Sequence, residues 1–210
     1  MDALQQPIWQ NLFAILAGYL IGSIPFAYIF AKWRTGKDLR NEGSGNIGTL
    51  NSYEVTGSRT VGVLTLIFDV LKGVVPTWLA MLYFSDAVVL PLAVALVVGH
   101  CFPIWLKFKG GRGLATAAGI TLAVNWLLLP LWLLGFGIGV LMKRQVHVGA
   151  VSACIFTAVS LMVIPYNLLN WFSVLDVPVN EIRNGAWLIL FVILLRHIEP
   201  MMALRDQPTE

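Results

Sequence analysis

The chain has 210 residues, of which 58% are hydrophobic and only 12% are charged, with a formal net charge of +3. These few polar side chains cannot cover the surface of a soluble globule of this size. The composition therefore excludes a soluble domain and predicts a protein that lies in lipid. The two cysteines, Cys101 and Cys154, stand in apolar stretches and form no metal-type cluster, so they suggest neither a disulfide framework nor a zinc site.

Apolar stretches separated by short polar breaks predict seven membrane-spanning helices, at about residues 9–31, 61–83, 87–106, 114–125, 126–142, 148–169 and 185–199. Three of these stretches are shorter than the roughly 20 residues that cross a typical hydrocarbon core, so we expect a thin or tightly packed bundle. Only Asn125 separates the fourth stretch from the fifth, and a single re-entrant pair remains an alternative there.

Basic residues predict the orientation, because Lys and Arg in short loops are retained on the cytoplasmic side. If the N-terminus is outside, twelve of the fourteen Lys and Arg residues fall in loops or ends on the cytoplasmic side. Of the other two, Lys72 lies within a span and Arg183 lies on the outer side. The sequence therefore predicts an all-α integral membrane protein, a seven-helix bundle with its N-terminus outside and its C-terminus cytoplasmic. Residues 1–210 are expected to form a single domain.

A loop rich in glycine, residues 40–51, follows the first predicted span. Gly43, Gly45 and Gly48 allow tight turns that can present backbone N–H groups to an anion such as phosphate. The spacing also matches the dinucleotide-binding fingerprint, but no strand precedes it, and Thr49 stands where a P-loop requires lysine. A phosphate-binding loop is favoured, and a flexible loop without a ligand is the alternative.

A second glycine loop follows the third predicted span, with Gly110 and Gly111 between Lys109 and Arg112 and Gly113 directly after Arg112. It leads directly into the small-residue stretch at 114–119. Glycine-rich backbone at a helix N-terminus, flanked by cations, is suited to anion binding. Cytoplasmic anchoring alone would account for the two cations but not for the glycines. We expect the backbone amides of the two loops, which follow the first and third predicted spans, to converge on a shared pocket for phosphate groups.

Ionisable residues inside the predicted spans are costly and normally pair with each other or face a cavity. Asp69 and Lys72 are three residues apart, as an ion pair on one helix face would be. A structural pair and a substrate contact are both open for them. His100 and His197 stand near predicted cytoplasmic helix ends, where each is either a hydrogen-bonded packing group or part of a site.

Four segments together resemble the bacterial acyl-phosphate:glycerol-3-phosphate acyltransferase family (PlsY type). They are Gly43-Ser44-Gly45-Asn46-Ile47-Gly48 with Asn51, Asp69-x-x-Lys72-Gly73, Gly99-His100-x-x-Pro103 leading to Phe108-Lys109-Gly110-Gly111-Arg112-Gly113-x-Ala115-Thr116, and Arg196-His197. Their order and spacing match the family along nearly the whole chain.

The resemblance implies transfer of an acyl group from acyl phosphate to the 1-hydroxyl of glycerol 3-phosphate, giving lysophosphatidic acid for phospholipid synthesis. It implies a multi-pass protein of the bacterial inner membrane, in contact with membrane lipid, with no cofactor, no metal and no nucleic-acid partner; protein partners are left open. The catalytic residues it implies are Ser44, Asn46, Lys109, Arg112 and His197. The substrate-binding residues are Gly43, Gly45, Gly48, Asn51, Gly110, Gly111, Gly113 and Thr116.

Three positions depart from the family pattern. Glu54 replaces a cation, Arg112 replaces a lysine and Pro200 replaces an asparagine. Arg59, five residues after Glu54, is a candidate substitute for the missing cation and is included among the substrate-binding residues. The departures leave a second hypothesis, a catalytically diverged paralogue that binds lipid phosphate or partners other membrane proteins. An anion or lipid transporter is a third, disfavoured because no pair of interrupted helices is visible in corresponding halves.

Overall fold

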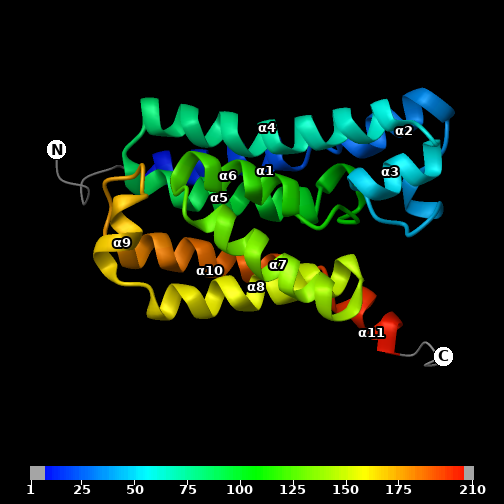
Figure 1. Cartoon of the computed structure of the whole chain (residues 1–210). Helices are drawn as coiled ribbons and strands as arrows, with labels where there is room; N and C mark the ends of the chain where they lie inside the picture. The colour runs from blue at the N-terminus through cyan, green and yellow to red at the C-terminus, as the bar shows by residue number, and fades with distance from the viewer. Residues whose placement is uncertain (1–7, 206–210) are drawn as a thin grey trace. The chain divides into compact units, whose positions relative to one another are not determined.

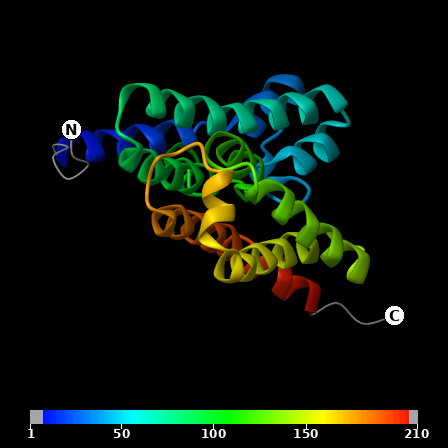
Figure 2. The same ribbon diagram turned by 60° about the vertical axis from the view of Figure 1, so that its left-hand side comes forward.

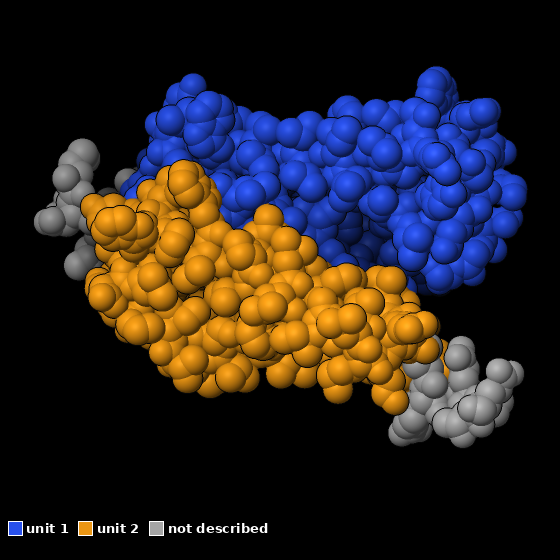
Figure 3. Space-filling view, viewed as in Figure 1, with its two compact units in different colours: residues 1–123 blue, residues 124–210 orange. Residues whose placement is uncertain are grey.

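The computed structural model describes residues 8–205, and these residues form helices joined by turns, with one isolated bridge between Asn125 and Ser173. They divide into two compact units, residues 1–123 and 124–210, which Figure 3 distinguishes by colour. The charge pattern predicts on which side of the membrane each chain end lies. The terminal residues themselves lie outside the described range.

The described residues of the first unit form six longer helices and two short 3₁₀ turns. In chain order these are α1 (Ile8–Gly22), α2 (Phe26–Thr35), η2 (Leu39–Asn41), α3 (Thr49–Thr56), α4 (Arg59–Tyr83), α5 (Asp86–Cys101), η3 (Ile104–Leu106) and α6 (Leu114–Val124), whose last residue begins the second unit. In Figure 1, α4 runs along α1 and α2, and the short α3 packs near its beginning. Both glycine loops belong to this unit.

The second unit is built around an antiparallel helix pair. Its helices are α7 (Leu128–Lys143), α8 (Val146–Val163), α9 (Tyr166–Trp171), α10 (Val179–Leu195) and α11 (Ile198–Arg205). α7 and α8 pack closely because Gly135 and Gly139 let the backbone of α8 approach, and α10 also packs against α8 (Figure 2). α11 begins just before Pro200, so this proline occupies the first turn, where a missing N–H breaks no helical hydrogen bond.

Every predicted span contains a helix in the structure. Four helical segments of the described chain are long and apolar enough to cross a membrane: Ile8–Thr35, Arg59–Tyr83, Asp86–Leu106 and Val146–Val163. Two shorter apolar helices, Leu114–Val124 and Leu128–Lys143, coincide with the predicted fourth and fifth spans. The predicted stretch at 148–169 is divided between α8 and α9, and the last span begins earlier than predicted, at Val179.

The first predicted span is not one uninterrupted helix. α1 ends at Gly22 and α2 begins at Phe26, so three residues, Ser23 to Pro25, interrupt the helix. Pro25 has no N–H and its ring blocks the preceding turn, which explains the break. Pro76 and Pro91 lie inside α4 and α5 without ending them, so proline alone does not locate a break in this chain.

Asn125 makes the turn between α6 and α7. Its side chain is fully buried and donates to the Leu169 carbonyl at 2.9 Å. The neighbouring backbone also bonds to the segment after α9, from Val174 N–H to the Val124 carbonyl at 2.9 Å. The single polar residue between the two apolar stretches therefore anchors a turn within the second unit.

Glycines allow α1 and α5 to touch. A Cβ built on Gly22 would collide with the Leu96 carbonyl, and one on Gly18 would lie 2.8 Å from the Leu92 carbonyl. Gly99 of α5 meets the backbone of α1 at Tyr19 and Ser23 in the same way. The spacing of Gly18 and Gly22 therefore serves packing inside the bundle.

Gly22→Ala is expected to lower the free energy of unfolding by about 1–3 kcal/mol, because the new methyl group would meet backbone that cannot rotate away. Thermal unfolding of the purified chain in detergent measures this. Gly137→Ala in α7 is the matched control, since a Cβ there meets no atom within 4 Å and alanine favours a helix. Equal unfolding midpoints for the two variants would contradict the packing described.

Candidate functional site

The first glycine loop is folded by left-handed glycines and one buried side chain. Gly43 and Gly45 have φ values of 58° and 69°, a region that glycine enters without steric cost. Gly48 is extended and caps α3, a short helix that the sequence did not predict. Asn51 and Glu54 therefore lie on a helix and not in the loop itself.

Asn51 holds this loop together from within. Its side chain is 1% exposed, and its amide nitrogen lies within hydrogen-bonding distance of the carbonyls of Leu39, Glu42 and Asn46, the last at 2.9 Å. Its amide oxygen accepts the N–H of Ser44 at 2.9 Å. A side chain so completely used by the backbone shapes the turn.

Arg40 closes the beginning of the same loop. Its Nε donates to the Asp38 carboxylate at 3.0 Å, and its guanidinium lies 5.5 Å from the centre of the Tyr28 ring. These hydrogen bonds hold the pKa of the Asp38 carboxyl below its ordinary value. The charge of Arg40 is thus compensated locally, by Asp38.

The second glycine loop folds back onto the end of α5. Lys107 and Phe108 both have positive φ, 53° and 62°, which reverses the chain after η3. The N–H of Gly111 then donates to the His100 carbonyl at 3.1 Å. Gly110 packs so closely on His100 and Pro103 that a Cβ would collide with both.

The two glycine loops meet, as the sequence predicted. A Cβ on Gly111 would lie 2.5 Å from the carbonyl oxygen of Ile47, so the backbones of the two loops are in direct contact there. Leu106 of the second loop also shares an apolar core with Ile47 and Leu39 of the first loop and with Ala27 and Ala31 of α2. The two glycine loops therefore pack directly against each other and share one apolar core.

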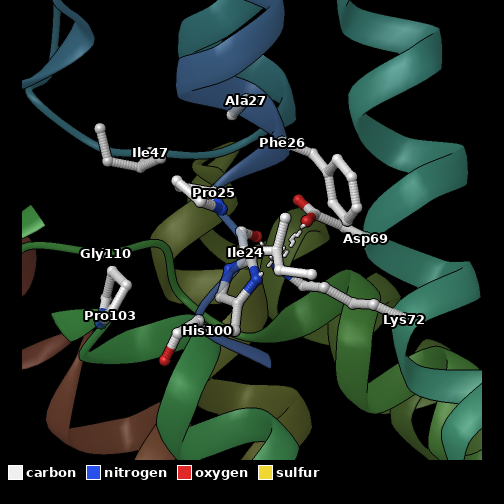
Figure 4. Close-up of a pocket in the computed structure, with 11 residues that line it drawn as sticks. Ile24, Pro25, Phe26, Ala27, Ile47, Asp69, Lys72, His100, Pro103 and Gly110 are labelled. Carbon is white, nitrogen blue, oxygen red and sulfur yellow. Dashed lines mark hydrogen bonds and ion pairs between the residues drawn. The ribbon is translucent and has the colours of Figure 1, made fainter. Parts of the chain in front are cut away.

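A buried cluster of polar side chains lies beneath this junction (Figure 4). Asp69 and Lys72 form the predicted ion pair, with Oδ1 and Nζ 2.8 Å apart and both side chains almost fully buried. Lys72 also donates to the Ile24 carbonyl in the break between α1 and α2, at 2.9 Å. His100 Nδ1 lies 3.7 Å from Asp69 and 3.2 Å from the hydroxyl of Thr116.

The pocket between these side chains has a volume of about 10 Å³. That is near the lower limit for a single water molecule, far below the size of a phosphate-bearing substrate. Figure 4 shows His100 in the middle of the pocket, with Asp69 and Lys72 on one side and Gly110 and Pro103 on the other. The pocket is the polar interior that supports the loops and does not itself admit substrate.

The predicted site residues are distributed unevenly. Ser44, Lys109 and Arg59 are exposed, Asn46 and Arg112 are partly buried, and Thr116 is fully buried. Glu54 is also exposed, on α3. His197 belongs to the second unit, where its Nδ1 lies 2.8 Å from the Ile193 carbonyl and its ring contacts His147; its predicted role stays a prediction.

Several of the amides expected to face a phosphate are used inside the loops. The N–H groups of Ser44, Gly45 and Gly111 donate to Asn51 Oδ1, the Glu42 carbonyl and the His100 carbonyl. α6 begins at Leu114, directly after Gly113, and the N–H groups at a helix N-terminus favour an anion. The groups that remain available to a substrate are therefore the hydroxyl of Ser44, the amide of Asn46 and the cationic side chains beside the glycine turns.

Sequence reasoning singled out Asp69, Lys72 and His100 but left them out of the predicted site. Their signal was the presence of ionisable groups in apolar helices. Tyr19, whose hydroxyl donates to the Phe102 carbonyl at 2.9 Å, had no such signal, because a tyrosine in a membrane helix is unremarkable by sequence. In the described part of the chain no group of three or more His, Cys, Asp or Glu residues could hold a metal ion.

Comparison with known proteins identifies the family of this chain. The family model described as glycerol-3-phosphate acyltransferase matches residues 12–207. A glycerol-3-phosphate acyltransferase of Syntrophotalea carbinolica is 46% identical over 145 residues, covering 66% of this chain and 71% of the relative. Glycerol-3-phosphate acyltransferase 2 of Thermotoga maritima is 40% identical over 148 residues, covering 70% and 74%.

Two crystal structures of PlsY (YgiH), an integral membrane glycerol 3-phosphate acyltransferase, share the fold. The glycerol 3-phosphate form has a TM-score of 0.76 and 32% identity, covering 96% of each chain. The lysophosphatidic acid form has a TM-score of 0.74 and 32% identity, covering 93% of this chain and 92% of PlsY. With its apolar helices of spanning length, this chain is a multi-pass membrane protein, and it belongs to the glycerol-3-phosphate acyltransferase family.

Proposed function

We propose that this chain transfers an acyl group from acyl phosphate to the 1-hydroxyl of glycerol 3-phosphate and so makes lysophosphatidic acid for phospholipid synthesis. The observation that carries the proposal is the similarity over 96% of the chain to an enzyme whose structures are described in a glycerol 3-phosphate form and a lysophosphatidic acid form. The contact between the two glycine loops supports it from the geometry, because two phosphate-bearing substrates need neighbouring anion sites.

The reaction balances without a covalent enzyme intermediate. The hydroxyl oxygen of the acceptor bonds to the acyl carbon, the bond from that carbon to the phosphate oxygen breaks, and inorganic phosphate leaves. The proton of the hydroxyl passes to a phosphate oxygen. The protein contributes by holding both substrates in register and by stabilising the negative charge that develops on the acyl carbonyl.

The proposed roles follow the chemistry of each side chain. Ser44 and Asn46 orient the acceptor through hydrogen bonds. Lys109 and Arg112, with Gly110, Gly111 and Gly113 beneath them, hold phosphate charge at the beginning of α6. Asn51 and Thr116 act indirectly, through the turns they hold, and Arg59 adds positive charge to the site. The ordering role of His197 is proposed from the resemblance alone.

The membrane arrangement proposed with this function has seven crossings, the N-terminus outside and the C-terminus and both glycine loops cytoplasmic. The distribution of Lys and Arg supports it. The helices α6 and α7 would then cross as a short pair joined at Asn125. A bacterial inner membrane is the location that fits a phospholipid-forming enzyme of this family.

A direct assay tests the proposal. Purified chain with radiolabelled glycerol 3-phosphate and palmitoyl phosphate is expected to form labelled lysophosphatidate, and palmitoyl-CoA in place of palmitoyl phosphate is expected to give little. Absence of product from protein that unfolds cooperatively would count against the reaction. Product formed only from palmitoyl-CoA would overturn the proposed donor.

The diverged-paralogue alternative rests on Glu54 and Pro200. Two unit charges about 5 Å apart interact by about 3 kcal/mol at an effective dielectric of 20. The repulsion between a carboxylate and a substrate phosphate at this distance would therefore weaken substrate binding strongly. Because Glu54 is exposed on α3 and Pro200 fits the first turn of α11, we expect activity in the natural sequence. Glu54→Arg together with Pro200→Asn should then change kcat/KM by less than about tenfold. Activity that arises only in this variant would favour the paralogue.

A further inference from the structure

Three buried side chains, Asp69, Lys72 and His100, lie beneath the glycine loops, and a part for them in catalysis rests on the proposed function. We propose that they are positioning residues for acyl transfer, which hold the second glycine loop in register with the first. They lie beneath the predicted site residues and reach the substrates only through the backbone of the loops. Their arrangement in Figure 4 joins three elements of the first unit at one point.

Lys72 fixes the helix break to α4. Its ammonium group lies 2.8 Å from the Asp69 carboxylate and 2.9 Å from the Ile24 carbonyl, which also accepts the N–H of Phe26 at 3.2 Å within the break. The ring of Phe26 supplies a third neighbour, with its centre 5.6 Å from Nζ. The first residues of α2, which lead to the first glycine loop, are thereby tied to α4.

His100 fixes the second loop to the same cluster. Its Nδ1 side faces Asp69 of α4 and the hydroxyl of Thr116 at the start of α6, while its carbonyl accepts the N–H of Gly111. The opposite edge of the ring, at Nε2, lies where a Cβ of Gly111 would be. The ring is therefore wedged between the charged cluster and the loop.

The wedge sets the distance between the loops. Gly111 has His100 Nε2 on one side and the Ile47 carbonyl on the other, so a displaced ring would release Gly111 from Ile47. Buried charges are costly and add little net stability when they can be replaced by apolar groups of the same shape. Retaining an ion pair at this point is better explained by the fixed position it imposes on His100 than by stability.

The second loop is expected to serve the acyl donor. Trp105 and Phe108 are 61% and 58% exposed and flank the turn that leads to Lys109, so an acyl chain finds apolar contacts next to a cation. Displacement of this loop should therefore first raise the KM for palmitoyl phosphate. A merely structural role would reduce the folded fraction and lower the apparent kcat, without changing KM.

The test compares Asp69→Asn combined with Lys72→Met, which leaves no unpaired buried charge, with Thr77→Val in the same helix. Thr77 is fully buried and bonds only to the Gly73 carbonyl of its own helix, so its replacement is a matched structural control. The double variant is expected to fold and to raise the KM for palmitoyl phosphate by about tenfold, the effect of one lost interaction. Thr77→Val should keep the KM of the natural sequence.

Limited trypsin digestion gives a readout that does not need activity. Cleavage after Lys107 and Lys109 should be several times faster in the double variant, while cleavage after Lys143 and Arg144 of the second unit stays the same. If the double variant does not fold, His100→Asn takes its place, because asparagine keeps the contact with Thr116 but no longer reaches Gly111.

Unchanged KM and unchanged cleavage in a folded variant would overturn the inference. If the natural sequence transfers no acyl group, the proposed function fails. Faster cleavage in the second loop of the double variant would still show that the buried side chains hold this loop in place.

Discussion

Gly111→Ala is expected to lower kcat/KM for acyl transfer by about 100-fold or more, the effect of displacing reacting groups by about 1 Å. The added methyl group would collide with the ring of His100 and lie 2.5 Å from the Ile47 carbonyl, so the two loops must move apart. Steady-state kinetics with palmitoyl phosphate and glycerol 3-phosphate measure the effect.

Gly36→Asn serves as the control for that substitution. Gly36 also lies in a loop of the first unit and has a positive φ of 72°, but a Cβ there meets nothing within 4 Å. Asparagine tolerates this conformation better than other residues with a side chain. We expect near-natural kinetics for Gly36→Asn, and a Gly111→Ala enzyme with equally unaffected kinetics would contradict the contact between the loops.

Asn51→Asp should be the most damaging isosteric change in the first loop. It replaces an amide donor, which faces the carbonyls of Leu39, Glu42 and Asn46, by an acceptor. Unsatisfied and repelling acceptors in a buried site are expected to cost about 2–4 kcal/mol of unfolding free energy, and transfer activity should fall with the shape of the loop. Thermal unfolding and kinetics on the same sample measure both.

Asn167→Asp makes the same chemical change at an exposed asparagine of α9, whose oxygen already acts as the acceptor. It should be neutral in both measurements. If Asn51→Asp were equally neutral, the buried amide would not be what shapes the first glycine loop.

The helical spans and the two loops could be predicted from sequence because their signals are local. Apolar length marks a span, and glycines beside cations mark a turn that can bind an anion. The meeting of the loops was also expected, from their positions after the first and third spans on one side of the membrane. Contact between Gly111 and Ile47 and the shared core at Leu106 confirm it.

What sequence reasoning could not supply depends on tertiary contacts. Pro25 favours the break at Ser23 to Pro25, but Pro76 and Pro91 lie inside helices without ending them, so the contact of Lys72 with Ile24 from another helix could not be predicted from the local sequence. α3 has a short and weakly apolar sequence and is held by packing against α4. Asn51 was predicted to bind substrate, whereas its hydrogen bonds in the structure all go to backbone groups of the first loop and η2.

The most direct measurement is backbone hydrogen exchange of the full chain in detergent, with and without glycerol 3-phosphate. If the two glycine loops form one phosphate site, exchange should slow at residues 43–51 and at residues 109–116 together, over the same concentration range. Slowing at only one of these segments, or at neither while acyl transfer proceeds, would contradict a shared site.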